Sequence, residues 1–363
     1  CHGGGGVATN GGEFTMTAGY VTGNYSEEAG GGLYVGHANM NGTPFSMSGG
    51  TVAGNYAESS EGGGIRISAH TNGTIRADTG KKIYITNNET CSDYDWGGGG
   101  VFVQENGILN IQDTLITENS ARGFGGGVGA CPTGETLITH TDGAAIYSNS
   151  ADGQNMSGGG HGKNYDTEVA KKSSVFTANG YNDYFCVRSS DNSNYISLVT
   201  GQMVGGGAAN WKGSCDNNAI TISKTGYAAA KYLFGLTAVP DDEAVSAAKK
   251  AAGVIISGNS AYTHGGGIMT NGGLIIGHTD RVETATPALE IKGTKKLTVD
   301  GVDAKSGLDF TFKLTDDSRK KGVTATSDAD TGAFTISPDK QYNKAGTYIY
   351  YLTEVNDGRT GVT

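Results

Sequence analysis

A run of three or four glycines opens a short apolar stretch six times along the chain, and each unit closes on an asparagine before the glycines begin again. A unit that recurs at a period of roughly 20 to 50 residues cannot bury its apolar side alone, so successive units must stack on one another. The repeat therefore predicts a solenoid over residues 1–280. The units begin at Gly3, Gly30, Gly62, Gly97, Gly125 and Gly265, and they close on Asn24, Asn55, Asn88 or its neighbour Asn87, Asn119, Asn149 and Asn259.

The apolar residues within a unit alternate, as in Leu33 and Val35 or Leu109 and Ile111, and this is the period of a strand rather than of a helix. Equivalent strands of successive coils can pair in parallel about 4.8 Å apart, and three short strands per coil give a parallel β-helix. We expect it to be right-handed, because parallel crossovers almost always are. The predicted fold class is all-β.

Glycine and asparagine have structural roles in such a coil. Glycine fits tight turns with positive φ and places where neighbouring coils approach too closely for a Cβ. Asparagine tolerates the left-handed region, and stacked side-chain amides can bond along the axis as a ladder. The glycines do not match the G-x-x-x-x-G-K-[ST] pattern of a phosphate-binding loop. We expect the ladder to consist of Asn24, Asn55, Asn88, Asn119, Asn149 and Asn259.

An insertion at about 157–252 interrupts the repeat. Its segment VPDDEAVSAAKKAAG predicts a short helix, with Pro240 at the first helical position, acidic residues near the N-terminal end and Gly253 as the C-cap. The rest of the insertion mixes aromatic residues with Asn, Asp and Ser. These aromatics either pack the insertion onto the β-helix or form a platform for sugar rings or a protein partner. The candidate binding residues are Tyr181, Tyr184, Phe185, Tyr195 and Trp211.

The five cysteines form no C-x-x-C pair and no Cys/His spacing that suits zinc, so we expect no metal site and no cofactor. Cys186 and Cys215 both lie in the insertion, and an extracellular protein would join them in a disulfide. Reduced, buried thiols are the alternative. The odd count leaves Cys1 or another thiol to pair elsewhere.

The net charge of −10 and the lack of a basic face argue against a nucleic-acid partner. No apolar stretch is long enough to span a membrane, so we expect no membrane insertion. The chain opens at Cys1 inside a coil, without an initiator methionine or a signal peptide. We therefore expect it to be a fragment with further coils upstream.

Many β-helix proteins degrade polysaccharides, so catalysis needs a test. Inverting hydrolysis requires two carboxylates about 6.5 to 9.5 Å apart. Of the N-T-D, D-D, G-H-G and R-I-K motifs of polygalacturonase-type enzymes, this chain has only the G-H-G of residues 160–162 in a suitable place. The pattern favours a protein without turnover. The alternative is a polysaccharide lyase or glycoside hydrolase with its site near His161.

A second all-β domain is predicted over residues 281–363, where only 8 of the 62 glycines lie and the pattern changes to alternating strands. Its motifs are T-K-K-L at residues 294–297, F-T-F-K-L at 310–314 and AGTYIYYLTE at 345–354. Their order resembles the isopeptide-forming pilin domain of Gram-positive surface proteins, over about 70 residues. The resemblance implies a β-sandwich, which is incomplete here because the chain stops at Thr363, before the family's final strand.

In that family a buried lysine attacks an asparagine carboxamide while a glutamate shuttles the proton, which requires a dry core. The resemblance implies Lys295 as the nucleophile and Glu354 as the acid, with the acceptor asparagine beyond Thr363. Lys296 is the alternative in register, since strand neighbours point to opposite faces. Lys295 and Glu354 could equally be ordinary surface charges.

The repeat units, with FTMTAGYVTGN and FSMSGGTVAGN leading into glycines, also resemble the β-helix regions of wall-anchored Gram-positive surface proteins. The resemblance implies an extracellular adhesin or stalk that binds a host glycan or surface protein, and that is attached to the cell wall through sequence downstream. The units that begin at Gly62 and Gly125 lack the F-x-M element, so those coils are expected to be irregular.

Overall fold

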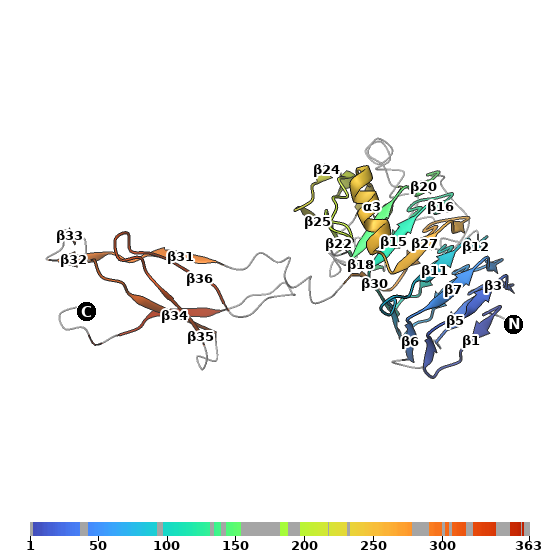
Figure 1. The fold of residues 1–363 in the computed structure, drawn as a ribbon, viewed down its shortest axis with the longest axis horizontal. Helices are drawn as coiled ribbons and strands as arrows, with labels where there is room; N and C mark the ends of the chain where they lie inside the picture. Colours follow the sequence, from blue (N-terminus) through green and yellow to red (C-terminus); the bar gives the residue numbers. More distant parts are fainter. Residues whose placement is uncertain are drawn as a thin grey trace. The chain divides into compact units, whose positions relative to one another are not determined.

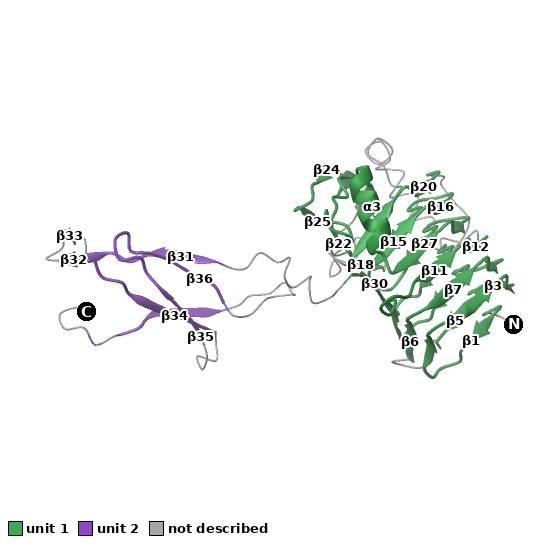
Figure 2. Cartoon of the chain, viewed as in Figure 1, with its two compact units in different colours: residues 1–279 green, residues 280–363 purple. Residues whose placement is uncertain are grey.

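The computed structural model divides into two compact units, residues 1–279 and 280–363 (Figure 2). Each unit is described by itself. The residues that the structure describes are 3–36, 43–92, 97–130, 134–138, 143–153, 182–187, 197–216, 218–230, 233–277, 290–299, 302–304, 307–316, 322–338, 349–356 and 358.

The first unit is a stack of parallel coils, and each coil passes through four sheets in turn, here named sheets 1 to 4 (Figure 1). The predicted all-β class and the stacked parallel coils are confirmed. Three strands per coil were expected and four are found, because a two-residue strand follows each asparagine corner. The first coil consists of β1 (Val7–Ala8), β2 (Phe14–Met16), β3 (Tyr20–Thr22) and β4 (Tyr25–Ser26).

The next coils repeat this path in register with the first. The second consists of β5 (Leu33–Val35), β6 (Thr43–Met47), β7 (Gly50–Ala53) and β8 (Tyr56–Ala57). The third consists of β9 (Ile65–Ile67), β10 (Thr71–Ile75), β11 (Ile83–Thr86) and β12 (Glu89–Thr90). The following strands are β13 (Val101–Val103), β14 (Ile108–Ile111), β15 (Thr114–Thr117), β16 (Ser120–Ala121), β17 (Val128–Ala130), β18 (Glu135–Ile138), β19 (Ala144–Tyr147) and β20 (Ser150–Ala151).

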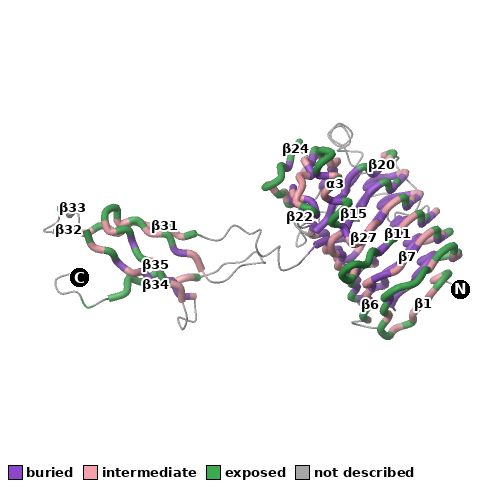
Figure 3. The backbone as a smooth tube through the Cα atoms, in the orientation of Figure 1, coloured by how far each residue is buried: buried purple, intermediate pink, exposed green. Residues whose placement is uncertain are grey.

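Inward-pointing aliphatic side chains stack along the axis and form the core. Figure 3 shows buried positions recurring along the coils of the first unit. Leu33 pairs with Ile65, which pairs with Val101, and the row continues through Ile268 to Val128. All five are fully buried. Burial of each such side chain stabilises the fold by about 1.5 to 3 kcal/mol, so the stacked rows supply the main driving force.

The six asparagines expected to form a ladder lie in one row, each hydrogen-bonded to the next coil. Asn24 Nδ2 donates to Asn55 Oδ1 at 2.8 Å, and Asn55 Nδ2 donates to Asn88 Oδ1 at 2.9 Å. Each acceptor oxygen also takes the backbone N–H of the preceding asparagine, at 3.0 Å for Asn24 and 3.1 Å for Asn55. The full row runs Asn24, Asn55, Asn88, Asn259, Asn119 and Asn149.

The asparagine ladder ends on an aspartate. Asp183 Oδ1 accepts from both Asn149 N and Asn149 Nδ2 at 2.9 Å, and its Oδ2 accepts from Ala238 N at 2.8 Å. An asparagine at position 183 that accepted from Asn149 through its Oδ1 would point its Nδ2 at the Ala238 N–H, and two donors would face each other. A carboxylate, which only accepts, therefore fits this end of the ladder. Burial raises the pKa of Asp183 to about 6, although the N–H donors of Asn149 and Ala238 lower it.

One coil is out of sequence order. In simple sequence order β15 would pair with β11 and β17 with β13. Between β14 and β15 the chain instead passes over one coil position, and this position is left open in all four sheets. Asp113 makes this crossing in the left-handed region (φ 52°), and its carbonyl accepts from Gly253 N at 2.8 Å and Val254 N at 3.0 Å. We call the segment that fills the position the intercalated coil: β27 (Val254–Ser257), β28 (Ser260–Ala261), β29 (Ile268–Thr270) and β30 (Gly273–Ile276).

The intercalated coil has neighbours on both sides in every sheet, as β27 has β11 and β15 in sheet 3. Its glycine corner is packed against backbone, because a Cβ on Gly266 would collide with the carbonyl oxygen of Ser120. Sequence order alone predicts that β27 follows the insertion at the end of the stack. Parallel pairing has no local signal for which coil stands next to which, and this placement was not foreseen.

The described part of the insertion extends the sheets of the first unit. Strands β21 (Tyr184–Val187) and β22 (Ser197–Thr200) pair in parallel with β17 and β18, and antiparallel strands then widen sheets 1 and 2. These antiparallel strands are β23 (Trp211–Cys215), β24 (Asn218–Ile222), β25 (Tyr227–Ala230) and β26 (Leu233–Thr237).

The predicted helix is α3 (Asp242–Ala251). It begins two residues later than its motif predicts: Asp241 is the N-cap and accepts from Ala244 N at 2.7 Å, so Pro240 precedes the cap. Its C-cap is Ala252 rather than Gly253. Ala244 and Ala248 are buried against Gly207 and Gly205, where the helix meets the insertion.

The second unit consists of antiparallel strands. In the larger sheet β34 (Thr311–Asp316) lies between β35 (Gly322–Thr326) and β37 (Tyr350–Glu354). The other pairs are β31 (Ile291–Thr294) with β36 (Ala333–Ile336), and β32 (Leu297–Val299) with β33 (Val302–Ala304). Phe312 of β34 stacks on Phe334 of β36, with ring centroids 4.0 Å apart, so these two sheets contact one another through aromatic side chains.

A buried histidine stands at the glycine corner of the intercalated coil. His264 is 1% exposed, its Nδ1 accepts from Phe124 N at 2.9 Å, and its ring stacks on Phe124 at 5.4 Å. Burial lowers the pKa of His264 to about 3. The histidine is therefore neutral in the folded protein across the physiological range.

Replacing a ladder asparagine should cost most in the middle of the row. In Asn259→Ala, Asn88 N and Asn88 Nδ2 both lose their acceptor, so we expect the free energy of unfolding to fall by about 3 kcal/mol. Asn24→Ala, at the half-exposed end, should cost less than about 1 kcal/mol. Urea unfolding of both variants measures the difference, and equal losses would contradict a role for the ladder in stability.

Acid should destabilise the first unit through His264. The pKa is about 6.5 unfolded and about 3 folded, so this residue's contribution is complete above pH 6.5 and is lost as pH falls toward 3. His264→Asn keeps an acceptor for Phe124 N but does not titrate. The stability difference between wild type and variant should therefore change by about 1.4 kcal/mol per pH unit below pH 6. The pH-dependent contribution of Asp183 to stability has the opposite sign but is the same in both proteins, so it cancels from the difference. A stability difference that stays constant with pH would contradict the assignment to His264.

Candidate functional site

The aromatic residues of the insertion that the structure describes follow the packing alternative rather than the platform. Tyr184 and Phe185 are fully buried and Trp211 is 2% exposed. The Tyr184 hydroxyl is hydrogen-bonded to Thr136 Oγ1, and Trp211 Nε1 donates to Thr200 O at 3.0 Å. The platform prediction is wrong for these three: Tyr184 and Trp211 point into the core of the first unit, and Phe185, on the opposite face of β21, stacks on Phe124 with ring centroids 4.7 Å apart. Tyr181 and Tyr195 lie outside the described residues.

The predicted Cys186–Cys215 disulfide is not formed. Both cysteines are register partners of Phe234, on opposite sides of strand β26. Two strand spacings separate them by about 9.6 Å, beyond the roughly 7 Å that a disulfide can bridge. Both are thiols. Cys186 Sγ lies 3.2 Å from Ser197 Oγ in the core, and burial raises the pKa of Cys215 to about 11.

Lys295 and Glu354 lie together in the second unit. Lys295 Nζ is 2.7 Å from Glu354 Oε2 and 5.0 Å from the centre of the Phe310 ring. Lys296 pairs instead with Asp303 at 3.2 Å, with side chains about 70% exposed. Of the two lysines, Lys295 is thus the one beside the glutamate. The Lys295 and Glu354 side chains are 24% and 36% exposed, so in this chain they form a partly solvated ion pair.

Exposed tyrosines gather on the outside of sheets 3 and 4 in the first three coils, and we call this surface the tyrosine face. Thr51 lies in register between Tyr20 on one side and Tyr84 on the other. The backbones of the two tyrosines are therefore two strand spacings apart, about 9.6 Å, with a small residue between them. Tyr20 is 81% and Tyr84 42% exposed. On sheet 4, Tyr25 and Tyr56 stack with centroids 5.9 Å apart.

Acidic groups border the tyrosine face. The Tyr25 hydroxyl is hydrogen-bonded to Glu58, and this bond raises the pKa of Tyr25 to about 12. The hydrogen bond with Cys91 raises the pKa of Tyr56 to about 12. Both hydroxyls therefore stay protonated near neutral pH. Aromatic rings beside carboxylates offer stacking surfaces and hydrogen-bond acceptors together.

A groove with a volume of about 450 Å³ lies on the outside of sheet 2. It exists because side chains are missing: Gly273 lies in register between Ile108 and Glu135, and Gly107 and Gly272 precede them at the corner. We call it the sheet-2 groove. Its rim is the corner where His70, Asn106 and Asn271 occupy equivalent positions in stacked coils.

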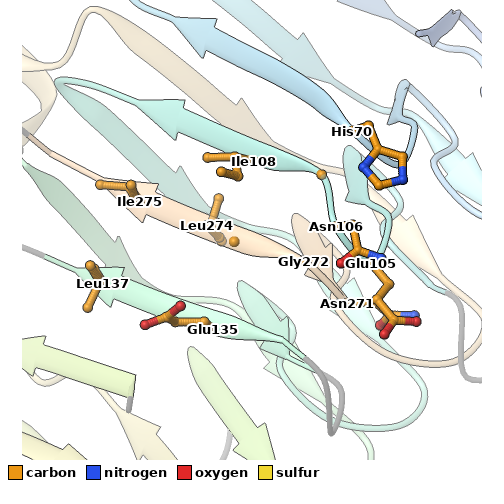
Figure 4. A pocket seen from close by; sticks show the side chains of 12 residues that line it. His70, Glu105, Asn106, Ile108, Glu135, Leu137, Asn271, Gly272, Leu274 and Ile275 are labelled. Atoms are coloured by element: carbon orange, nitrogen blue, oxygen red, sulfur yellow. The ribbon is translucent and has the colours of Figure 1, made fainter. Parts of the chain in front are cut away.

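The sheet-2 groove has a polar end and an apolar end (Figure 4). His70, Glu105, Asn106 and Asn271 gather at one end, on the corners. Ile108, Ile275 and Leu137 lie at the other, together with Glu135. His70 and Asn106 hold the left-handed corner conformation, with φ 57° and 64°, and His70 N donates to Asn106 O at 3.0 Å. The corner is fixed by backbone bonds between coils.

The two carboxylates of the sheet-2 groove come from different coils. In Figure 4, Glu105 lies at the polar end beside Asn106 and Asn271, and Glu135 lies on the strand that carries Leu137. Within the described ranges no three His, Cys, Asp or Glu side chains are grouped to hold a metal ion. His161, the residue named for the enzyme alternative, lies outside the described residues.

Neither exposed surface was predicted as a site. The alternation of Tyr84 between Ile83 and Ile85 shows which way the ring points, so the tyrosine face could have been found by aligning the units on their asparagines. The sheet-2 groove had no such signal, because it depends on Gly273 standing beside Ile108, and these residues come from coils far apart in sequence.

Comparison with known proteins adds no relative: no family model, no curated protein and no solved structure matches the chain. Among the residues that the structure describes, no helix is long and apolar enough to cross a membrane.

The Lys295–Glu354 contact should contribute little to stability in this chain. Lys295→Met removes a partly exposed ion pair, so we expect the free energy of unfolding of the second unit to fall by less than about 1 kcal/mol. Lys296→Met, at a solvent-exposed pair, is the matched control and should have almost no effect. Intact mass spectrometry should give the full sequence mass. A loss of one ammonia, or a large destabilisation, would show that the amine is covalently bonded.

Proposed function

We propose that the chain is part of a bacterial cell-surface attachment protein, an adhesin or stalk that binds glycans or proteins on another surface without turning over a substrate. The tyrosine face carries this proposal. Tyr20, Tyr25 and Tyr84 expose large rings where a protein that acts alone would place small or charged side chains. Side chains of this kind are enriched at binding surfaces.

The scaffold favours binding because it is rigid at the positions that present these rings. Val21 and Ile85 lie beside Tyr20 and Tyr84 on the same strands and point inward, and Ile85 is fully buried. Asn55 and Asn88 bond successive coils directly beneath. A ring on such a strand loses little further freedom on contact, so more of the contact energy appears as affinity.

The resemblance to Gram-positive wall-anchored proteins supports an extracellular location, with the second unit as a tether toward the cell wall. The position of Lys295 beside Glu354 is compatible with an isopeptide bond to an asparagine from a further strand, as the resemblance implies. The alternative function is a polysaccharide lyase or glycoside hydrolase. The chain carries only the G-H-G of residues 160–162 from the motifs of such enzymes, which weighs against this alternative.

Binding should depend on the exposed tyrosines. The chain is incubated with a panel of host and plant glycans, and both retention and new chain ends are recorded. We expect retention without cleavage, and Tyr20→Ala and Tyr84→Ala should each weaken it about tenfold through loss of roughly 1.4 kcal/mol of contact energy. Tyr227→Ala removes a ring of similar exposure (59%) from β25 and is the control.

Two outcomes would contradict the proposal. New chain ends would show an enzyme. Retention that is unchanged in both tyrosine variants, or equally reduced in Tyr227→Ala, would remove the tyrosine face as the binding surface.

A further inference from the structure

We propose that the sheet-2 groove binds a stretch of polysaccharide that carries protonated amines, as a chain of deacetylated amino sugars does. The inference rests on the proposed attachment function, since it gives the ligand class of a second site on the same scaffold. The sheet-2 groove and the tyrosine face lie on different sheets, so each can be tested without the other.

The size of the sheet-2 groove suits a short oligosaccharide. About 450 Å³ lies within the usual range of roughly 300 to 1,000 Å³ for small-ligand sites. Ile108 and Glu135 are two strands apart, so their backbones lie about 9.6 Å from one another on either side of Gly273. A pyranose ring fits across such a width, and a linked chain can extend along the groove.

The apolar end supplies a surface for the C–H face of a sugar ring. Ile108 is 46% exposed although it is a large aliphatic residue, and Ile275 and Leu137 are half-buried beside it. Ile275 pairs with Leu137 in register, so the two side chains form one continuous patch. Covering this patch removes apolar area from water, which favours a ligand with both apolar and polar faces.

The charge of the groove selects the ligand. The charged side chains among its described lining residues are Glu105 and Glu135, and none of those residues is Lys or Arg. A carboxylate forms its strongest hydrogen bonds with charged donors such as an ammonium group. Asn106 and Asn271 add amide groups for hydroxyls. A polysaccharide of uronic acids would be repelled, and an N-acetylated chain would lack the charge.

The test measures binding of glucosamine oligomers to the whole chain by calorimetry, beside N-acetylglucosamine oligomers and oligogalacturonate. We expect the glucosamine oligomer to bind at least tenfold more tightly than the acetylated one, more weakly at high salt, and the oligogalacturonate not to bind. Glu105→Gln and Glu135→Gln should each weaken binding about tenfold. Glu243→Gln makes the same charge change on the exposed side of α3, outside both proposed surfaces, and should leave binding unchanged.

A variant that fills the groove separates shape from charge. A Cβ on Gly273 would make only ordinary contacts with Ile108, so Gly273→Val should fold, which thermal unfolding checks, and should abolish binding. Unchanged affinity in Gly273→Val, or equal affinity for the acetylated oligomer, would overturn the inference. If the tyrosine variants lose glycan retention but the groove variants keep it, the attachment function stands and the groove proposal fails.

Discussion

The hydrogen bond from each corner asparagine to the next coil is the interaction on which the first unit depends. A buried amide without a partner costs about 1 to 3 kcal/mol, so a coil that places an asparagine at this corner must have another coil beside it. Asn88 and Asn119 receive that partner from Asn259, a residue about 140 to 171 positions away in sequence. The ladder therefore holds the intercalated coil in place as well as the neighbours it joins.

The sequence was sufficient for the features that repeat. The spacing of Asn24, Asn55 and Asn88 predicts a ladder, and the alternation around Tyr84 predicts strands, because each unit carries the same local signal. The features that depend on which coil stands next to which were not predictable. The burial of Trp211 and the position of Gly273 beside Ile108 follow from pairing between distant segments, and composition alone cannot give that pairing.

The same backbone supports two different exposed surfaces because strand residues alternate inward and outward. On sheet 3 large outward residues make the tyrosine face, and on sheet 2 missing side chains make a groove. Ile85 on sheet 3 and Leu109 on sheet 2 point inward, and both are fully buried in the core. Substitutions on the outside can thus change the exposed surface while the core remains as it is.

The intercalated coil has a mechanical consequence. The chain leaves the first unit after Ile276, at the end of β30, and β30 has β14 on one side and β18 on the other. Tension transmitted from residues further along the chain would therefore load an interior strand and not an edge strand. Extraction of that strand must break two ladders at once, whereas a coil at the end of a stack peels from one. A pull on the C-terminal side is thus resisted by the middle of the solenoid.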